Sequence, residues 1–251
     1  IRLESDDTAH GFSILGTDVN VEIPKRGRGS LTVTFEATKA GRYTFECSQL
    51  CGAGHAFMRG VIVVTDPQQA IPLAHALLEG GIDVMEITLR HRAGLPAIEA
   101  VAKHVPQMFV GAGTVTQTFE VRQVKDAGAS FALSPGMTDA LVASVKEAQI
   151  PFVPGVMTPG EVMRAREHGF GLLKLLPAAQ AGGLAMLKTL HGPLGDVRFC
   201  PTGGIAADNV QDMLRQPNVA MVGGSWLTPA DQVSNQDWTS IAQLPREATR
   251  L

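Results

Sequence analysis

The sequence predicts an α/β protein in which an all-β segment, residues 1–60, precedes a (β/α)8 (TIM) barrel over residues 61–251. Three observations lead to this prediction. Short segments that alternate apolar and polar residues precede residue 60. Eight apolar runs alternate with amphipathic stretches after it, and glycine or threonine stands at many of the junctions. Strands that alternate with helices are typical of parallel βα units closing into a barrel, and a doubly wound open sheet is the alternative.

The all-β prediction for the first segment comes from its period-two alternation. Residues 20–23, 30–36 and 41–46 alternate polar with apolar side chains, and Gly, Pro and Lys lie between them. This pattern is typical of antiparallel strands joined by turns. We expect no helix in this part of the chain.

The barrel prediction rests on the order of strands and helices after residue 60. The expected strands are residues 61–64, 84–89, 108–113, 131–134, 152–155, 172–176, 197–200 and 220–222. Amphipathic helical stretches are expected between these strands, and examples are residues 68–79, 94–104, 116–127, 138–148, 158–168 and 184–191. Thr116, Thr138 and Thr158 are the expected N-caps, and Glu161 completes a capping box with Thr158. Four helices are expected to end at Gly80, Gly128, Gly169 and Gly192.

Composition limits the classes of function. The chain has 251 residues, of which 45% are hydrophobic, and a net charge of -3. This weak negative charge gives no support for a nucleic acid or an anionic membrane as partner. No apolar run reaches about 18 residues, so we expect no transmembrane helix. The chain starts at Ile1 without a signal-peptide pattern, so we expect a fragment or a processed product. Its three cysteines form no disulfide framework.

Lys174 is the first candidate for a catalytic residue. It lies inside the apolar run 170–177, which predicts a buried strand. Lysine is rarely buried without a reason. Burial favours the neutral amine, which can attack a ketone and form a Schiff base. The alternative is a lysine whose stem is buried while its ammonium group reaches water from the strand end.

Polar residues at other strand ends suggest a ligand. Glu86, Thr88 and Arg90 share one face of strand 84–89 by period two, and inward-facing polar groups cost energy unless they bind one another or a ligand. A structural ion pair of Glu86 with Arg90 or Lys174 is the alternative. Glycine pairs at 203–204 and 223–224 follow the last two strands, where barrels often bind phosphate, although each pair alone also fits a turn. Together these groups predict a phosphorylated 2-keto acid as ligand.

The combined motifs resemble the bacterial 2-dehydro-3-deoxy-6-phosphogluconate (KDPG) aldolase family, which also acts on 4-hydroxy-2-oxoglutarate (KHG). The stretches that carry the resemblance are 84–90, 111–115, 134–136, 174–178, 197–205 and 223–227. The resemblance implies a class I lyase without a cofactor, in which Lys174 forms the Schiff base and Glu86 moves protons. It implies pyruvate and glyceraldehyde 3-phosphate as products, a homotrimer and a cytoplasmic location. The implied substrate-binding residues are Arg90, Thr114, Pro135, Thr202, Gly203, Gly204, Gly224 and Ser225.

The chain departs from this family at two places. The family often has Phe near the lysine, where this chain has Leu175 and Leu176. The family also has an N-terminal helix before its first strand, and residues 1–60 contain a different pattern.

That pattern clusters two thiols, an imidazole and a thioether within residues 47–58. Soft sulfur with imidazole suits copper, whereas a pair of buried small hydrophobes is the alternative for the cysteines. The segment resembles a truncated copper A cupredoxin domain of cytochrome c oxidase subunit II, an extracytoplasmic domain. The resemblance implies a binuclear copper centre that accepts electrons from cytochrome c. Its implied ligands are His10, Cys47, the Gln49 carbonyl, Cys51, His55 and Met58.

The two resemblances meet in strand 61–64, which would end one domain and begin the other. Three functional readings follow: an aldolase with an inert N-terminal segment, a copper A electron-transfer module with a passenger barrel, or a non-functional chimera. We interpret the join as a spliced chimera, or as a mis-assembled or engineered reading frame, and a natural fusion is the alternative. We favour the aldolase because its predicted active site is complete, whereas the copper domain lacks strands.

Overall fold

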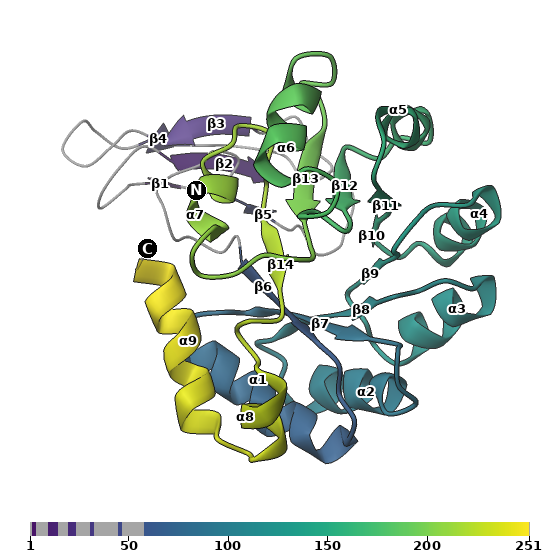
Figure 1. Ribbon diagram of the computed structural model, residues 1–251. Helices are drawn as coiled ribbons and strands as arrows, with labels where there is room; N and C mark the ends of the chain where they lie inside the picture. The colour runs from purple at the N-terminus through teal and green to yellow at the C-terminus, as the bar shows by residue number, and fades with distance from the viewer. Residues whose placement is uncertain are drawn as a thin grey trace. The chain divides into compact units, whose positions relative to one another are not determined.

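A computed structural model describes residues 2–3, 10–14, 20–23, 31–32, 45–46 and 58–250. The chain forms two compact units, Ile1–His55 and Ala56–Leu251 (Figure 1). The predicted division between residues 60 and 61 stays a prediction.

The described part of the first unit consists of short strands. β2 (His10–Ile14) pairs antiparallel with β3 (Asn20–Ile23) and with β5 (Phe45–Glu46). β1 (Arg2–Leu3) pairs antiparallel with β4 (Leu31–Thr32). The expected antiparallel pairing is therefore present among these residues.

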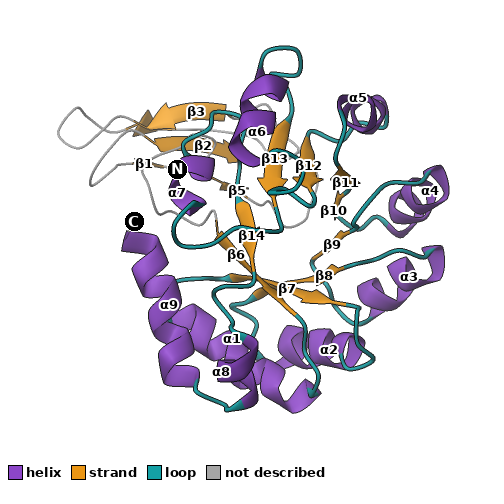
Figure 2. Cartoon of the chain, in the orientation of Figure 1, coloured by secondary structure: helices purple, strands orange, loops and turns teal. Residues whose placement is uncertain are grey.

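The second unit is built around a curled parallel sheet, with its strands in the middle and its helices outside (Figure 2). One set of strands has the order β10-β9-β8-β7-β6-β14 and a second has the order β11-β12-β13. Parallel bridges Phe199–Val219 and Thr202–Gly223 connect β13 with the region of β14, and only Pro154 separates β10 from β11. The strands are β6 (Met58–Ile62), β7 (Val84–Thr88), β8 (Phe109–Gly113), β9 (Phe131–Leu133), β10 (Phe152–Val153), β11 (Gly155–Val156), β12 (Leu172–Leu175), β13 (Arg198–Pro201) and β14 (Val222–Gly224).

This sequence of pairings returns to its first strand, so the sheet is an α/β barrel of the predicted type. The open doubly wound alternative is wrong, because β6 pairs with β7 on one side and with β14 on the other. An open sheet would leave the first and last strands unpaired with each other.

Helices cover the outside of this sheet. They are the 3-10 helix η1 (Pro67–Gln69), α1 (Ala70–Glu79), α2 (Gly94–His104), α3 (Thr118–Asp126), α4 (Asp139–Ala148), α5 (Pro159–Glu167), α6 (Gly183–His191), α7 (Val210–Leu214), α8 (Ala230–Ser234) and α9 (Trp238–Arg250). The last three were not among the helical stretches named from the sequence. α7 and α8 have five residues each, too few to show a helical period, and α9 contains Pro245.

The bounds of five predicted strands differ from the observed ones by one residue, and those of the other three differ by more. β6 starts at Met58 and ends at Ile62, so Val63 and Val64 lie beyond the strand. The expected strand 152–155 is divided at Pro154, whose missing N–H cannot join the ladder. β14 covers residues 222–224 instead of 220–222. An apolar run marks a buried strand but does not show where its pairing starts.

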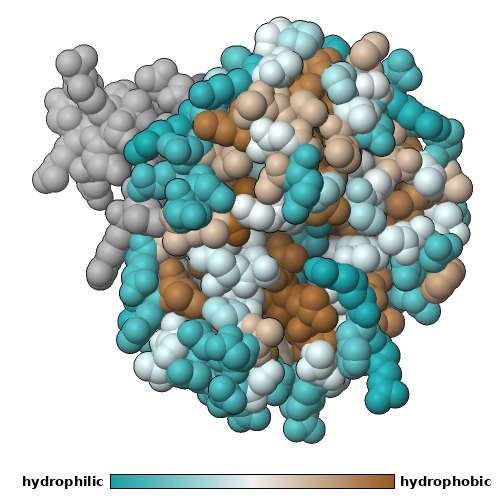
Figure 3. All heavy atoms as spheres, viewed as in Figure 1, coloured by the Kyte–Doolittle hydropathy of each residue, from teal (hydrophilic) through white to brown (hydrophobic). Residues whose placement is uncertain are grey.

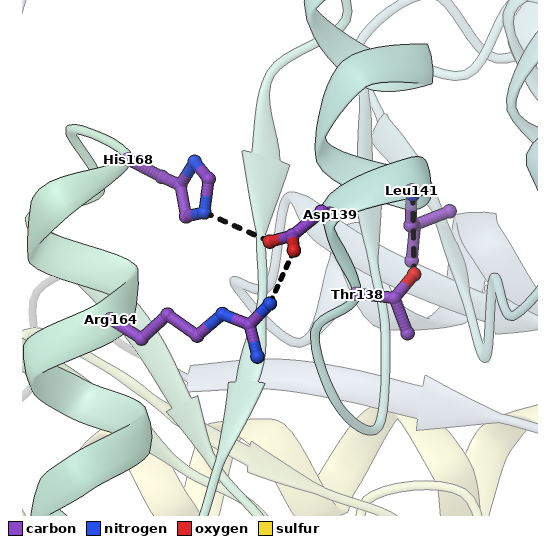
Figure 4. A network of polar contacts seen from close by, with 5 residues as sticks. All are labelled: Thr138, Asp139, Leu141, Arg164 and His168. Carbon is purple, nitrogen blue, oxygen red and sulfur yellow. Dashed lines mark hydrogen bonds and ion pairs between the residues drawn. The ribbon is translucent and has the colours of Figure 1, made fainter.

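Two of the three predicted N-caps are confirmed. The Thr138 hydroxyl accepts a hydrogen bond from the Leu141 N–H, and Thr158 forms the capping box with Glu161 (Figure 4 shows the first). Thr116 is not an N-cap, because α3 starts one residue later, with Gln117 as its N-cap. The Glu120 carboxylate accepts hydrogen bonds from the N–H groups of both residues, which fixes this start.

Buried polar side chains gather at the C-terminal strand ends of the barrel. Its apolar core lies between the sheet and the helices, for example where Leu73 and Leu77 of α1 are fully buried. Glu86, Thr88, Ser134, Lys174 and Thr202 are also buried, and they belong to β7 and β12 or follow β9 and β13. None of the described helices has both the length and the hydropathy for a membrane span.

Candidate active site

Lys174 and Glu86 form a buried ion pair at the centre of the barrel. The Lys174 Nζ lies 3.0 Å from the Glu86 Oε1 and donates a hydrogen bond to it. Lys174 is 4% exposed and Glu86 is fully buried. The alternative in which the lysine reaches water from its strand end is therefore wrong.

These two side chains meet across the interior of the barrel. Glu86 belongs to β7 and Lys174 to β12, and no pairing joins these two strands. Their side chains can touch only inside the ring of strands, which shows that residues 86 and 174 point inward. The neighbours of Lys174 in the ladder are Gly155 and Cys200, the latter a buried thiol that sequence reasoning did not single out.

Gly113 makes room for the carboxylate of Glu86. A Cβ atom at Gly113 would overlap Glu86 Oε1, so only glycine fits at this end of β8. A glycine inside a strand is a sequence signal for such a close approach. The signal was present in the predicted stretch 111–115, but it gave no indication of which group approaches.

Thr114, next to Gly113, has an unusual backbone. Its φ is +61°, a left-handed conformation that a β-branched residue rarely adopts. Such strain is found most often at ligand sites, where surrounding structure holds it in place. Thr114 is half-buried and directly follows Gly113, the residue that the Glu86 carboxylate approaches.

Thr88 continues the inward-facing row that starts at Glu86, and Arg90 follows the end of this strand. Thr88 ends β7 and is 1% exposed, while Arg90 lies in the following turn and is exposed. The prediction that these residues share a face therefore fits Glu86 and Thr88, whereas for Arg90 it stays a prediction.

The loop after β9 lies against the strand that neighbours Lys174. A Cβ atom at Gly155 would overlap the carbonyl of Pro135, and Gly155 is the ladder partner of Lys174. The Ser134 hydroxyl donates a hydrogen bond to the Gly136 carbonyl and holds this loop in its turn. Pro135 is thus brought close to the strand of the lysine.

The glycine loop after β13 is attached to the loop after β12. The Ala178 N–H donates to the Thr202 carbonyl at 2.9 Å, and the Ala179 N–H donates to the Gly203 carbonyl at 3.1 Å. Gly203 and Gly204 have φ angles of +94° and +77°, which residues other than glycine rarely adopt. Their N–H groups donate to no carbonyl of the described residues.

The end of β14 is next to that loop. The bridge between Thr202 and Gly223 places the two strand ends together. The Trp226 ring packs on Gly224, where a Cβ atom would overlap it, and Ser225 is exposed. Backbone N–H groups and a hydroxyl in such an arrangement suit an anion.

The predicted copper site is a different case. Cys47, Gln49, Cys51 and His55 lie outside the described residues, whereas His10 lies in β2 and Met58 in β6. Among the residues that the structure describes, no three His, Cys, Asp or Glu side chains form a cluster for a metal ion. The copper centre stays a prediction.

Comparison with known proteins supports the barrel, because the region of the chain that matches is nearly the same as the second unit. The sequence pattern of one family, described as "Aldolase: KDPG and KHG aldolase", matches residues 54–244. The KHG/KDPG aldolase of Escherichia coli is 45% identical over 188 residues, 75% of this chain and 88% of that protein. The 2-dehydro-3-deoxy-phosphogluconate aldolase of Dickeya dadantii is 44% identical over 188 residues, again 75% of this chain and 88% of that protein.

Solved structures give the same result. The KDPG aldolase of Legionella pneumophila, with pyruvate captured as a covalent carbinolamine intermediate, superposes with a TM-score of 0.76 at 40% identity. That match covers 78% of this chain and 95% of the other. The aldolase of Zymomonas mobilis with 3-phosphoglycerate superposes with a TM-score of 0.73 at 37% identity, covering 77% and 91%.

Proposed function

The chain belongs to the KDPG and KHG aldolase family and is a lyase of that kind, and we propose that it cleaves KDPG through a Schiff base on Lys174. The observation that carries this proposal is the buried 3.0 Å contact between the Lys174 Nζ and the Glu86 carboxylate. An amine and a carboxylate in one dry site supply a nucleophile and a proton carrier.

Formation of the Schiff base uses both groups. The neutral Lys174 amine adds to the keto carbon of the substrate and gives a carbinolamine. Glu86, having taken the proton that the amine loses, gives a proton to the carbinolamine hydroxyl, which leaves as water. The resulting iminium can accept an electron pair, so no metal or other cofactor is needed for the next step.

Cleavage reverses the role of Glu86. Its carboxylate takes the proton from the hydroxyl on the second carbon from the iminium carbon. The bond between this hydroxyl-bearing carbon and the carbon next to the iminium then breaks. The electron pair moves into the iminium and forms an enamine, while glyceraldehyde 3-phosphate leaves. Protonation of the enamine carbon and hydrolysis of the iminium release pyruvate and restore the Lys174 amine.

The surrounding strand ends would hold the substrate. We assign the pyruvate-derived part to Arg90, Thr114 and Pro135, and a substrate hydroxyl to Thr202. We assign the phosphate to the backbone of Gly203, Gly204 and Gly224 and to the Ser225 hydroxyl. The glycine backbone conformations and the adjacent ends of β13 and β14 support the phosphate assignment. KHG carries no phosphate, so it would use only the residues assigned to the pyruvate-derived part.

Reductive trapping tests this proposal. The protein is incubated with pyruvate and sodium borohydride and then digested for mass spectrometry. We expect a reduced pyruvate adduct on the peptide that contains Lys174, and loss of cleavage activity in proportion to trapping. Lys188, an exposed lysine of α6, serves as the internal control and should carry no adduct. Absence of an adduct on Lys174 in folded protein contradicts the proposal.

We propose a homotrimer acting in the cytoplasm, where sugar-acid substrates occur. Exposed apolar side chains of the barrel support an oligomer, and Figure 3 shows hydrophobic surface on the face drawn there. Phe119 is 62% and Met163 is 54% exposed, more than large apolar residues usually are. Light scattering should give three times the 26.6 kDa of one chain, and a monomer mass contradicts the trimer.

The electron-transfer alternative has a separate test. A binuclear copper centre held by two thiolates absorbs strongly in the visible range. Copper added to reduced protein should produce this absorption only if Cys47 and Cys51 bind the metal as predicted. Cytochrome c would be a partner only in that case.

A further inference from the structure

Thr88 has a buried hydroxyl that the fold itself does not use. The residue is 1% exposed, and its Oγ1 has no hydrogen-bond partner among the described residues. A buried hydroxyl without a partner destabilises a protein, and valine has the same shape without this cost. The hydroxyl at this position therefore needs an explanation from outside the folded chain.

Thr88 lies near the residues proposed to react with the substrate. Thr88 lies two residues after Glu86 on β7, so both side chains point into the barrel. Its ladder partner is Gly113, the residue whose missing side chain makes room for the Glu86 carboxylate. The hydroxyl of Thr88 and the carboxylate of Glu86 thus lie at the same level of the barrel interior.

The row of inward-facing residues indicates which part of a substrate reaches this hydroxyl. The keto carbon must lie at the Lys174 Nζ, which is 3.0 Å from Glu86. The carboxylate of a 2-keto acid is bonded to that carbon. Thr88 lies at the level of the Glu86 carboxylate, and Arg90 follows it by two residues in the turn after β7. A substrate carboxylate that reaches Arg90, as proposed above, therefore passes the Thr88 hydroxyl.

The phosphate end is excluded by the strand order. The glycine loops follow β13 and β14, while Thr88 belongs to β7, which is separated from β14 by β6. The hydroxyl therefore belongs to the end of the site where the keto acid binds.

We propose that Thr88 is a substrate-binding residue whose Oγ1 donates a hydrogen bond to the carboxylate of the 2-keto acid. This inference rests on the proposed aldolase function and adds a specificity element to it. Ligand binding would then supply the partner that the hydroxyl lacks in the free protein. Selection of keto acids over simple ketones would depend in part on this contact.

The experiment compares Thr88→Val and Thr88→Ser in the full chain by borohydride trapping with two probes. Pyruvate carries the carboxylate, whereas hydroxyacetone is a ketone without one. Thr88→Val should raise the pyruvate concentration for half-maximal trapping by about 10-fold or more, the effect of losing one hydrogen bond to a charged group. Trapping of hydroxyacetone should not change, and Thr88→Ser should trap pyruvate like the wild type.

Thr228→Val is the matched control. Thr228 is 7% exposed, and its Oγ1 also has no hydrogen-bond partner among the described residues. It follows β14, which β6 separates from the strand of Glu86, so its replacement should leave pyruvate trapping unchanged. Both valine variants should keep the melting temperature of the wild type or raise it by about 2–4 °C.

Each other outcome contradicts one specific statement. Failure of the wild type to trap pyruvate overturns the aldolase proposal itself. If the wild type traps and Thr88→Val needs no more pyruvate, the inference about Thr88 is wrong. It is also wrong if both probes lose trapping equally, or if Thr88→Val unfolds, because the hydroxyl then has a structural role.

Discussion

The buried pair of Lys174 and Glu86 connects activity with stability. Removing one partner of a buried ion pair leaves an uncompensated charge and typically costs about 3–5 kcal/mol, whereas removing both charges is often neutral. We expect Lys174→Met to abolish pyruvate trapping and to lower the free energy of unfolding by about that amount. The double variant Lys174→Met/Glu86→Gln should recover most of this loss in a urea titration. A double variant no more stable than Lys174→Met would show that the pair is not coupled.

Glu86 can be tested separately through its proposed proton transfers. Glu86→Gln keeps the shape of the side chain but cannot move a proton, so cleavage should slow by about 10²–10⁴-fold. The lysine remains present, so an adduct with pyruvate should still form, although more slowly. Steady-state cleavage and the time course of trapping provide the two measurements. A variant with normal cleavage would remove Glu86 from the mechanism.

Gly113 offers a test of geometry without a change of charge. A methyl group at this position overlaps the Glu86 carboxylate and must displace it from the lysine. We therefore expect Gly113→Ala to reduce cleavage by at least about 10²-fold, since small misplacements of catalytic groups have effects of that size. Gly160→Ala is the control, because no atom lies within 4 Å of its added Cβ. Equal activity of the two variants would contradict the close approach seen at Gly113.

Sequence reasoning found the buried polar residues of the barrel better than their arrangement. Lys174 was recognisable as a charge inside an apolar run, and Glu86, Thr88 and Arg90 as one face of a strand. The sequence did not decide whether residues 86 and 174 touch, because this contact forms only when the strands close into a ring. The role of Gly113 was also undecided, since a glycine in a strand indicates the close approach of another group but does not identify that group.

At the level of elements, the capping box of α5 makes stability depend on pH. The Met157 N–H, and then the N–H and hydroxyl of Thr158, donate hydrogen bonds to Glu161 and hold the pKa of its carboxyl below the usual value of 4.5. A pKa that is lower in the folded protein stabilises it above the unfolded pKa, and this contribution is lost as the pH falls through the folded pKa.

This sign gives a prediction for Glu161→Gln. The variant should be less stable than the wild type at pH 7 by about 1 kcal/mol, the usual effect of a helix cap, which corresponds to a melting temperature about 2–4 °C lower. The difference should shrink as the pH falls below the usual pKa of glutamate, where the wild-type carboxyl also becomes protonated. Thermal melts across this pH range measure it. A difference that stays constant with pH would exclude the carboxylate as its cause.

A carboxylate between two helices provides a comparison for that measurement. Asp139 at the start of α4 accepts hydrogen bonds from Arg164 of α5 at 2.5 Å and from His168 at 3.2 Å (Figure 4). The hydrogen bond from Arg164 lowers the pKa of Asp139. The pair is exposed, so solvent and salt screen it and its removal should matter less than removal of the cap.

Elements with a clear period were predicted well, and those without one were missed. Residues 94–104 were expected as a helix and form α2 with the same bounds, because the stretch has a regular apolar face. α7 and α8 were missed because five residues do not complete two helical turns. The start of β6 was wrong by three residues because Gly60, in the middle of the strand, interrupts the apolar run.

For the whole molecule, the question is which part of the chain the aldolase site needs. β6 is the strand that completes the ring, since it pairs with β7 and β14, and its residues Val61 and Ile62 are buried. Both partners of β6 belong to the unit Ala56–Leu251. The burial of Lys174 therefore depends on residues 58–62, whose pairings among the described residues all lie within the second unit.

Two truncations test this statement. A chain that starts at Ala56 keeps β6 and both of its pairings, so we expect it to fold and to trap pyruvate on Lys174 like the full chain. A chain that starts at Thr65 lacks β6 and leaves β7 and β14 with unpaired edges inside the ring, so it should aggregate or lose trapping. Circular dichroism and the trapping assay measure both effects. If the chain from Ala56 failed while the full chain trapped pyruvate, residues 1–55 would have a role in the barrel that its strand pairings do not explain.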